Sequence, residues 1–527
     1  MKIQRPVDMS GKGLKPLLVV ALLVGFGVGL AAQEDVTLVE AVTAGNAAAV
    51  RASLERGGDA NAQQVDGTTV LLRAVSRDNL EVADLLIRAG ADVRVANRYG
   101  LSPLALACLN GNAAMAEKLL EAGADANSTQ QGGESVLMTA ARTGNATVVQ
   151  HLLDRGADVN AREEWKGQTA LMWAAAENNA AAVQTLIAGG ADIAARSKTS
   201  RGVNELGNRG FTALTFAARA GSIDATQALL EGGANVNDAL ADGTSALVLA
   251  VMSAHYEMAA FLLDHGANPN AAGQGWTALH QIVWTRRPNR GFNTVFPAPE
   301  GRVDSLSLAK KLLLHGADIN AQATQGAPSS ITGRNILNII DATPLFLAAH
   351  RLDLDLMRLL LENGADPRLP NEDGTTPLLA AAGVGLYNPG ENPGTPERSA
   401  EAVKLCLEAG GDATTVDGNG DTALHGAAYW DSPGAMELLV AANVPIDIVN
   451  NKGWTPLRVA DGVMVDPGTA IHYGPNVAAQ LRELLKERGL PVPDPEPFDY
   501  GERTGPYGGR TGNPGAQGTA QESSVVR

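Results

Sequence analysis

Histidine, cysteine and acidic side chains are the groups that could bind a metal ion or catalyse a reaction, and this 527-residue chain holds 8, 2 and 57 of them. None stands in a spacing typical of catalysis. The sequence lacks His-Glu-x-x-His, Cys-x-x-Cys, Gly-x-Ser-x-Gly and a phosphate-binding Gly-Lys-Thr loop. No nucleophile is paired with a base. We therefore expect no enzyme activity, no bound metal and no cofactor.

Four of the histidines occupy recurring positions that suit a structural role. His265 and His315 each precede a glycine at an expected helix end, where a cation complements the helix dipole. His280 and His425 each follow a Thr-Ala-Leu sequence. Many aspartates recur singly in Gly-Ala-Asp turns, whereas calcium takes about 6 to 8 oxygen ligands. We interpret these aspartates as turn formers.

A short Thr/Ser-x-Leu element recurs along most of the chain. Its eleven copies begin at Thr69, Ser102, Ser135, Thr169, Thr212, Ser245, Thr277, Thr343, Thr376, Thr422 and Thr455. A degenerate first copy lies around Leu38, which is 33 residues before Leu71. A fixed period of this length is typical of a repeat architecture, so we count twelve units.

Residues 132–163 show what one unit encodes. Ser135 is suited to cap a first short helix, and a glycine at Gly144 separates it from a second. Gly156 ends the second helix and turns the chain into the next unit. Neither helix can bury its apolar side alone, so stacking of neighbouring units must supply the missing surface.

The repeated unit resembles the ankyrin repeat over residues 34 to about 488. Both halves of that motif recur in phase, with Gly-x-Thr-Pro-Leu at 374–378 and 453–457 and Gly-Ala-Asp-x-Asn at 123–127, 156–160 and 316–320. The family's histidine is present only at His280 and His425. The resemblance implies an all-α solenoid, in which helix pairs stack into a curve, hairpin turns project to one side, and a concave face recognises proteins.

The composition agrees with such a stack, since 45% of residues are hydrophobic but only 4% are aromatic. Small apolar side chains on close-packed helices must therefore form the core. Cys108 and Cys406 both fall inside expected helices, seven units apart. At roughly 10 Å per helix layer they lie ~70 Å apart, far beyond disulfide reach. We expect two free, buried thiols.

Six aromatic residues fall where the repeat places a partner-facing surface. Trp165, Phe211 and Trp276 lie on hairpins beside the turn glycine, and Trp284, Tyr429 and Trp430 end first helices beside the concave face. Trp173, by contrast, is expected to face the core. We predict that the six rings form a partner-binding surface centred on units five to eleven. The alternative is that these rings pack on neighbouring hairpins.

Five stretches exceed the regular period of the solenoid, which we place at residues 32–488. They are expected to form inserted loops near 198–207, 286–304, 323–340, 385–398 and 464–476. Their Asn, Pro, Gly and aromatic content favours ordered turns, with linker-like disorder as the alternative. Residues 489–527 are rich in Pro and then Gly, and we expect this tail to be disordered.

The chain carries a formal net charge of -16 at pH 7. An acidic surface repels phosphates and anionic lipids, so we expect neither nucleic acid nor a membrane surface as a partner. A basic patch on another protein, or a cationic ligand, fits better. We expect the protein itself to be an elongated monomer.

Residues 1–31 resemble a secretory signal peptide. A basic region through Lys15 precedes an apolar run from Leu17 to Leu30 and a small-residue cleavage site ending at Ala31. This run is shorter than the ~20 residues that span a bilayer. We expect export to the periplasm or the medium, with the mature chain starting at Ala32 or Gln33. The alternative is an uncleaved membrane anchor.

Three classes of function remain open. The first is a non-catalytic scaffold that binds a partner protein. The second is an enzyme whose site lies in the inserted loops of units eight to twelve, which carry polar residues such as Arg286, Arg287, Asn388 and Glu391. The third is a structural spacer. The lack of a nucleophile paired with a base favours the scaffold over the enzyme.

Overall fold

The computed structural model describes residues 37–198, 210–287, 301–325, 337–386, 394–463 and 472–494. Within these residues the chain forms twelve helix pairs and isolated β-bridges. The number of pairs confirms the twelve units that the repeated element predicts. The expected signal, the tail beyond residue 494 and at least half of each inserted loop lie outside the described residues.

The first helices of the pairs are short. They are α1 (Leu38–Ala44), α3 (Val70–Ser76), α5 (Pro103–Asn110), α7 (Val136–Thr143), α9 (Ala170–Ala176), α11 (Ala213–Ala220), α13 (Ala246–Met252), α15 (Ala278–Arg286), α18 (Pro344–His350), α20 (Pro377–Ala382), α22 (Ala423–Tyr429) and α24 (Pro456–Ala460).

The second helices follow them directly or after an insertion. They are α2 (Ala47–Glu55), α4 (Leu80–Arg88), α6 (Ala113–Glu121), α8 (Ala146–Asp154), α10 (Ala180–Ala188), α12 (Ile223–Glu231), α14 (Tyr256–Asp264), α16 (Ser305–Leu314), α19 (Leu354–Glu362), α21 (Pro396–Glu408), α23 (Pro433–Ala441) and α25 (Pro475–Glu487). Three expected loop boundaries shift, because α15 runs through Arg286, α21 begins before residue 398 and α25 begins at Pro475.

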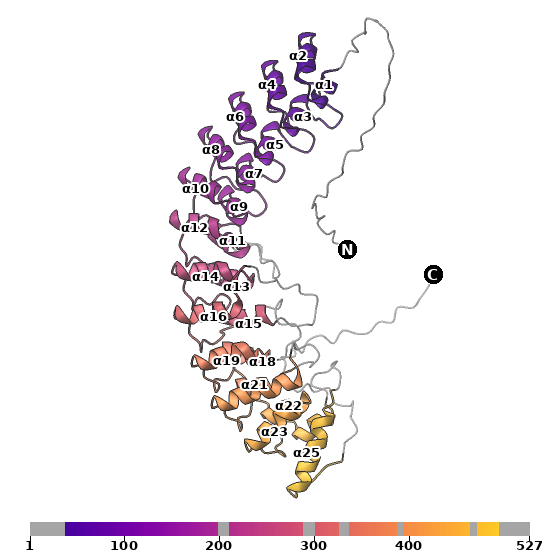
Figure 1. Cartoon of the computed structure of the whole chain (residues 1–527), viewed down its shortest axis with the longest axis vertical. Helices are drawn as coiled ribbons and strands as arrows, with labels where there is room; N and C mark the ends of the chain where they lie inside the picture. Colours follow the sequence, from indigo (N-terminus) through magenta and orange to yellow (C-terminus); the bar gives the residue numbers. More distant parts are fainter. Residues whose placement is uncertain are drawn as a thin grey trace, which may run out of the picture.

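The helix pairs stack into an arc (Figure 1). First helices contact first helices and second helices contact second helices along the stack. The first helices line the inner, concave side of the arc, while the second helices lie on its outer side. The hairpins between units project from the inner side. This is the all-α solenoid that the repeat predicts.

Most of the described helices begin at a polar residue whose side chain caps them, whereas α25 begins at Gly474 without a side-chain cap. In unit four the hydroxyl of Ser135 accepts a hydrogen bond from the Met138 backbone N–H at 3.2 Å, as its place in the repeat predicts. The second helix is capped by Asn145, whose carbonyl oxygen accepts from Val148 N–H at 3.1 Å. Asn145 also donates to the Gly111 carbonyl of the preceding unit at 2.5 Å. The same side chain therefore starts a helix and joins two units.

Glycine is favoured where the two helices of unit four meet. Gly144 adopts a left-handed conformation with φ 82 at the end of α7. A Cβ there would lie 2.4 Å from the Asn179 side-chain oxygen of the next unit. Both the backbone and the close approach of the neighbouring unit favour glycine here, although Asp78 and Asn178 adopt a similar positive φ at the equivalent position of other units.

The Gly-Ala-Asp segments form turns, as their sequence predicts. The carboxylate of Asp158 accepts from the backbone N–H of Asn160 at 2.9 Å, and Asp125 and Asp318 do the same with the residue two positions on. The two cysteines, Cys108 and Cys406, are free and buried, as expected. Burial raises the pKa of both thiols to about 12.

Candidate functional site

The structure buries five of the six aromatic residues that the sequence places on the partner-facing surface. Trp165 is 78% exposed, but Phe211, Trp276, Trp284, Tyr429 and Trp430 are all at most 6% exposed. The expectation that these five rings are exposed is therefore wrong. The open alternative, in which such rings pack within the stack, describes them better. Trp173, expected in the core, is only partly buried.

Contacts between units explain why the rings are buried. The indole N–H of Trp276 donates to the Gln325 carbonyl at 3.0 Å, and its ring lies 5.5 Å from that of Trp284. Phe211 lies 5.0 Å from Phe216 within its own unit. A ring beside a turn glycine thus fills the space between adjacent hairpins instead of facing solvent.

The exposure of the concave side changes along the arc. We define the inner row as the residues seven positions after each capping Thr or Ser: Ser76, Leu109, Arg142, Ala176, Arg219, Met252, Trp284, His350, Gly383, Tyr429 and Gly462. In units two to six the row is exposed, with Ala176 partly buried. Met252 in unit seven is partly buried, and every member from Trp284 onward is buried. Accessible concave surface in this row therefore lies in units two to six.

The accessible part of the inner row combines cations with apolar groups. Leu109 is 45% exposed, and the Arg142 side chain is 43% exposed. The Arg142 guanidinium lies 5.5 Å from the centroid of the Trp173 ring and 3.7 Å from the Glu134 carboxylate. Arg219 stacks over Phe211 at 4.9 Å, and burial lowers its pKa. The sequence-based prediction missed this surface. A signal was present, because the inner row is polar or charged in units two, four and six but not in units eight, ten and twelve.

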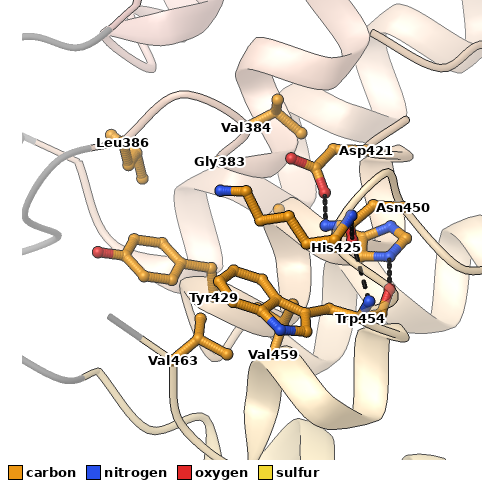
Figure 2. Close-up of a pocket in the computed structure, with 12 residues that line it drawn as sticks. Gly383, Val384, Leu386, Asp421, His425, Tyr429, Asn450, Trp454, Val459 and Val463 are labelled. Atoms are coloured by element: carbon orange, nitrogen blue, oxygen red, sulfur yellow. Dashed lines mark hydrogen bonds between the residues drawn. The ribbon is translucent and has the colours of Figure 1, made fainter. Parts of the chain in front are cut away.

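A recess lies at the C-terminal end of the arc, between units ten and twelve (Figure 2). Its walls are Gly383, Val384, Leu386, Asp421, His425, Gly426, Tyr429, Asn450, Lys452, Trp454, Val459 and Val463. Its empty volume, including the part open to solvent, is about 410 Å³. The Lys452 ammonium lies 4.9 Å from the centroid of the Trp454 ring. The recess therefore joins two aromatic rings, several aliphatic side chains and a pair of opposite charges.

Burial shifts the titration of the charged groups around this recess. It lowers the pKa of Lys452 to about 8, despite the opposing effect of Asp421 and Asp417. Burial, followed by the nearby Asp421 carboxylate, raises the pKa of Asp417 to about 6. The Asp421 carboxylate accepts a hydrogen bond from the Asn450 amide at 2.8 Å.

The motif histidines are engaged in structural hydrogen bonds, as predicted. His425 has Nδ1 3.1 Å from the Thr422 backbone N–H and Nε2 3.0 Å from the Trp454 carbonyl. His280 makes the same contacts with Thr277 and, at 3.0 Å, the Ala342 carbonyl. Burial lowers the pKa of His280 to about 4. With both ring nitrogens engaged, neither histidine is placed to act as a general base.

Three of the remaining candidate groups for chemistry have structural contacts or positions in the described residues. His265 and His315 follow the last residues of α14 and α16, at the helix ends that the sequence predicts. Arg286 pairs with Asp353, whereas Asn388 and Glu391 lie outside the described residues. Across the described ranges, no three histidine, cysteine or acidic side chains gather as a metal-binding group. No helix in the same ranges combines the length and apolar character needed to cross a bilayer.

Comparison with known families identifies the repeat. Residues 38–130, 123–197, 197–273 and 217–289 match the family described as ankyrin repeats (3 copies). Residues 341–372 and 419–451 match the single ankyrin repeat. These matches together cover more than half of the chain. The chain belongs to the ankyrin-repeat family.

Individual ankyrin-repeat proteins share part of their length with this one. Mouse ankyrin repeat and SOCS box protein 16 is 31% identical over 237 residues, which are 41% of this chain and 47% of the mouse protein. The chicken nuclear factor NF-kappa-B p105 subunit is 29% identical over 275 residues, 50% of this chain and 23% of that protein. The chain thus matches less than half the length of either relative.

A solved structure is similar as well. The crystal structure of the human ASB11 ankyrin repeat domain aligns with a TM-score of 0.38 and 25% sequence identity. The alignment covers 44% of this chain and 98% of the human domain.

Proposed function

We propose that this ankyrin-repeat chain is a non-catalytic scaffold that binds a partner protein on its concave face and hairpin tips. The observation that carries the proposal is the exposed inner row of units two to six, where an arginine side chain and a leucine face solvent side by side along the arc. Ankyrin repeats generally mediate protein–protein interaction. Exposed arginines and aromatic rings are residue types that dominate binding energy at such interfaces.

The exposed Trp165 extends this surface to the hairpin tips. Its ring lies against the preceding hairpin, since a Cβ on Gly132 would come within 3.4 Å of the indole. Val65 and Tyr99, on the hairpins of units two and three, are 104% and 64% exposed. The accessible binding surface that we propose therefore spans units two to six, in place of the line through units five to eleven that the sequence suggested.

Local charge on this surface differs from that of the whole chain. The net charge of -16 favours a basic partner, but Arg142 and Arg219 place cations on the exposed inner row. We propose that the part of the partner lying along the exposed inner row of units two to six, which we call the groove, carries acidic side chains. Binding through exposed charges weakens as salt screens them, so the affinity should fall between 50 and 300 mM salt, conditions under which the Debye length shortens from about 14 to about 6 Å.

Substitutions on the two sides of the arc test the proposal. Affinity capture with the full chain first supplies a partner for measurement. Leu109→Ala and Arg142→Ala together should weaken binding at least tenfold, since each removes a side chain from the groove. The matched control is Leu314→Ala, which removes an exposed leucine (85%) at the end of the outer helix α16. Equal affinity in the groove variant and the wild type would refute the proposal.

We further propose that the chain is exported. The support is the basic segment and short apolar run of residues 1–31. The mature protein should start at Ala32 or Gln33. N-terminal sequencing of the exported protein tests this, because a chain that retains Leu17 to Leu30 would instead be anchored by its signal.

A further inference from the structure

Two arginines beside unit nine differ in how their charge is neutralised. The Nε and Nη2 atoms of Arg286 donate to the two carboxylate oxygens of Asp353, at 2.6 and 2.9 Å. Asp353 is fully buried, so this bidentate pair satisfies both groups away from water. In Arg286, the Nε and Nη2 edge of the guanidinium therefore binds a carboxylate.

Arg351 presents the same edge without a carboxylate. The residue is 1% exposed, and its Nε and Nη2 find no hydrogen-bond acceptor among the described residues. Its guanidinium carbon lies 4.2 Å from the centroid of the Trp284 ring. The indole N–H of Trp284, which is 2% exposed, also has no acceptor. Three buried N–H donors therefore lie in one cluster on first helices of units eight and nine.

Stacking on the indole does not offset the cost of this burial. A desolvated cation–π contact is worth about 2 kcal/mol, whereas burying an unpaired ion costs several kcal/mol even after the protein relaxes. The pKa of Arg351 reflects this imbalance, since burial lowers it to about 9 and no acidic side chain opposes the shift. Buried donors without acceptors are rare in native proteins and point to a missing partner such as an ion.

We propose that Arg351 and Trp284 form a binding site for a small carboxylate. The two oxygens of a carboxylate match the open Nε and Nη2 edge of Arg351, as Asp353 matches Arg286, and the Trp284 N–H supplies a further donor in the same cluster. A bound carboxylate neutralises the buried charge and accepts hydrogen bonds from the unpaired donors. A bound water molecule could accept such a bond but would leave the charge of Arg351 unpaired. This site is separate from the exposed groove of units two to six and does not depend on partner binding there.

Thermal unfolding of the full chain tests the site with acetate as the probe. The wild type is equilibrated overnight in chloride or in acetate at the same ionic strength and pH, because the donors are enclosed. Acetate should raise the midpoint of unfolding with the logarithm of its concentration, by roughly 2 °C once that concentration is about a hundredfold above the dissociation constant. If the unfolding midpoint is the same in acetate and in chloride, the proposal is wrong. The same result is expected if a carboxylate of the chain itself already occupies the site, and it overturns the proposal in that case too.

Variants at Arg351 separate a ligand site from a structural stack. Arg351→Met removes the unpaired charge but keeps an apolar side chain on Trp284, so in chloride it should unfold at or above the wild-type temperature and should not respond to acetate. Arg351→Lys keeps the charge but lacks the two-donor edge, so the acetate response should also be lost. Arg358→Met, at an exposed arginine of α19 that pairs with Glu401, is the control and should keep the wild-type response.

Two outcomes at Arg351 would count against the site. If Arg351→Met unfolds below the wild type in chloride, the arginine acts as a structural stack on Trp284. If Arg351→Met or Arg351→Lys keeps the acetate response, acetate binds elsewhere on the chain. Either result rejects the carboxylate site, and neither bears on the proposed groove of units two to six.

Discussion

The side chain of Asn127 bridges unit three to unit four. Its amide nitrogen donates to the carbonyl of Gly156 at 2.9 Å, and its amide oxygen accepts from the backbone N–H of Asp158 at 2.7 Å. Asn160 and Asn237 repeat both bonds to the units that follow them. The asparagine that ends each Gly-Ala-Asp-x-Asn segment is thus a link between neighbouring units as well as part of a turn.

Asn127→Ala should weaken the junction between units three and four. Both bonds lie at the surface, so we expect a loss of about 1 kcal/mol in the free energy of unfolding. In a repeat array this loss is felt at one interface, so hydrogen exchange at the Asp158 amide should accelerate more than exchange in distant units. Urea unfolding and hydrogen exchange measure the two effects.

Gln150→Ala is the control for this junction, because Gln150 bonds only within its own helix to Asp154. It should change exchange at Asp158 little. If both variants accelerate exchange equally, the Asn127 side chain does not hold the two units together.

The fold could be predicted from the sequence because its signals are local. A capping serine, a turn glycine and an aspartate each determine the conformation of residues within a few positions. Each of the twelve units can therefore be recognised from its own sequence. The exposure of the aromatic rings depends instead on distant residues. Trp276 bonds to Gln325, 49 positions away across an insertion, and no local pattern predicts that contact. Repeat phase placed the rings correctly on hairpins and helix ends but did not determine what covers them.

Trp276 and Trp165 should respond in opposite ways to truncation. Trp276 is fully buried against Trp284, so Trp276→Ala should lower the free energy of unfolding by about 3–5 kcal/mol through the cavity that it leaves. Trp165→Ala removes an exposed ring and should change stability by less than about 0.5 kcal/mol. If Trp165 contacts the partner, its variant should instead lose affinity. Chemical denaturation together with partner titration measures both, and equal loss of stability in the two variants would contradict the assignment.

The two thiols should report on unfolding. Cys108 and Cys406 are fully buried, and burial raises the pKa of each to about 12, so almost no thiolate forms in the native state. An aromatic disulfide reagent should therefore react with neither thiol in the native protein and with both in denaturant. Rapid reaction of either thiol under native conditions would show that its unit opens without global unfolding.

Asp417 gives a pH-dependent prediction. Its pKa is raised from 3.8 to about 6, first by burial and then by Asp421, so the folded state favours the protonated acid. Because the pKa of this carboxyl is higher in the folded state, its contribution to stability is fully present at a pH below its pKa in the unfolded chain. That contribution is lost as the pH rises from about 4 through 6. At pH 7.5 the ionised carboxylate should therefore destabilise the fold. Asp417→Asn should raise the free energy of unfolding at pH 7.5 by about 1–3 kcal/mol and by much less near pH 4.

Neighbouring hairpins show that an asparagine fits at this position. The Asp417 carboxylate accepts from the backbone N–H groups of Asn419 and Asp421 at 2.9 and 2.8 Å. The amide oxygens of Asn371 and Asn450 accept the equivalent pairs of backbone bonds in the hairpins before and after it. The Asp417→Asn variant should therefore keep these two backbone bonds, while it loses the buried charge and the weaker bond that the second carboxylate oxygen accepts from the Asn419 amide at 3.2 Å. Urea unfolding at pH 4 and pH 7.5 measures the effect of the variant on the free energy of unfolding. If Asp417→Asn raises it by the same amount at both pH values, the charge of Asp417 does not cause the destabilisation.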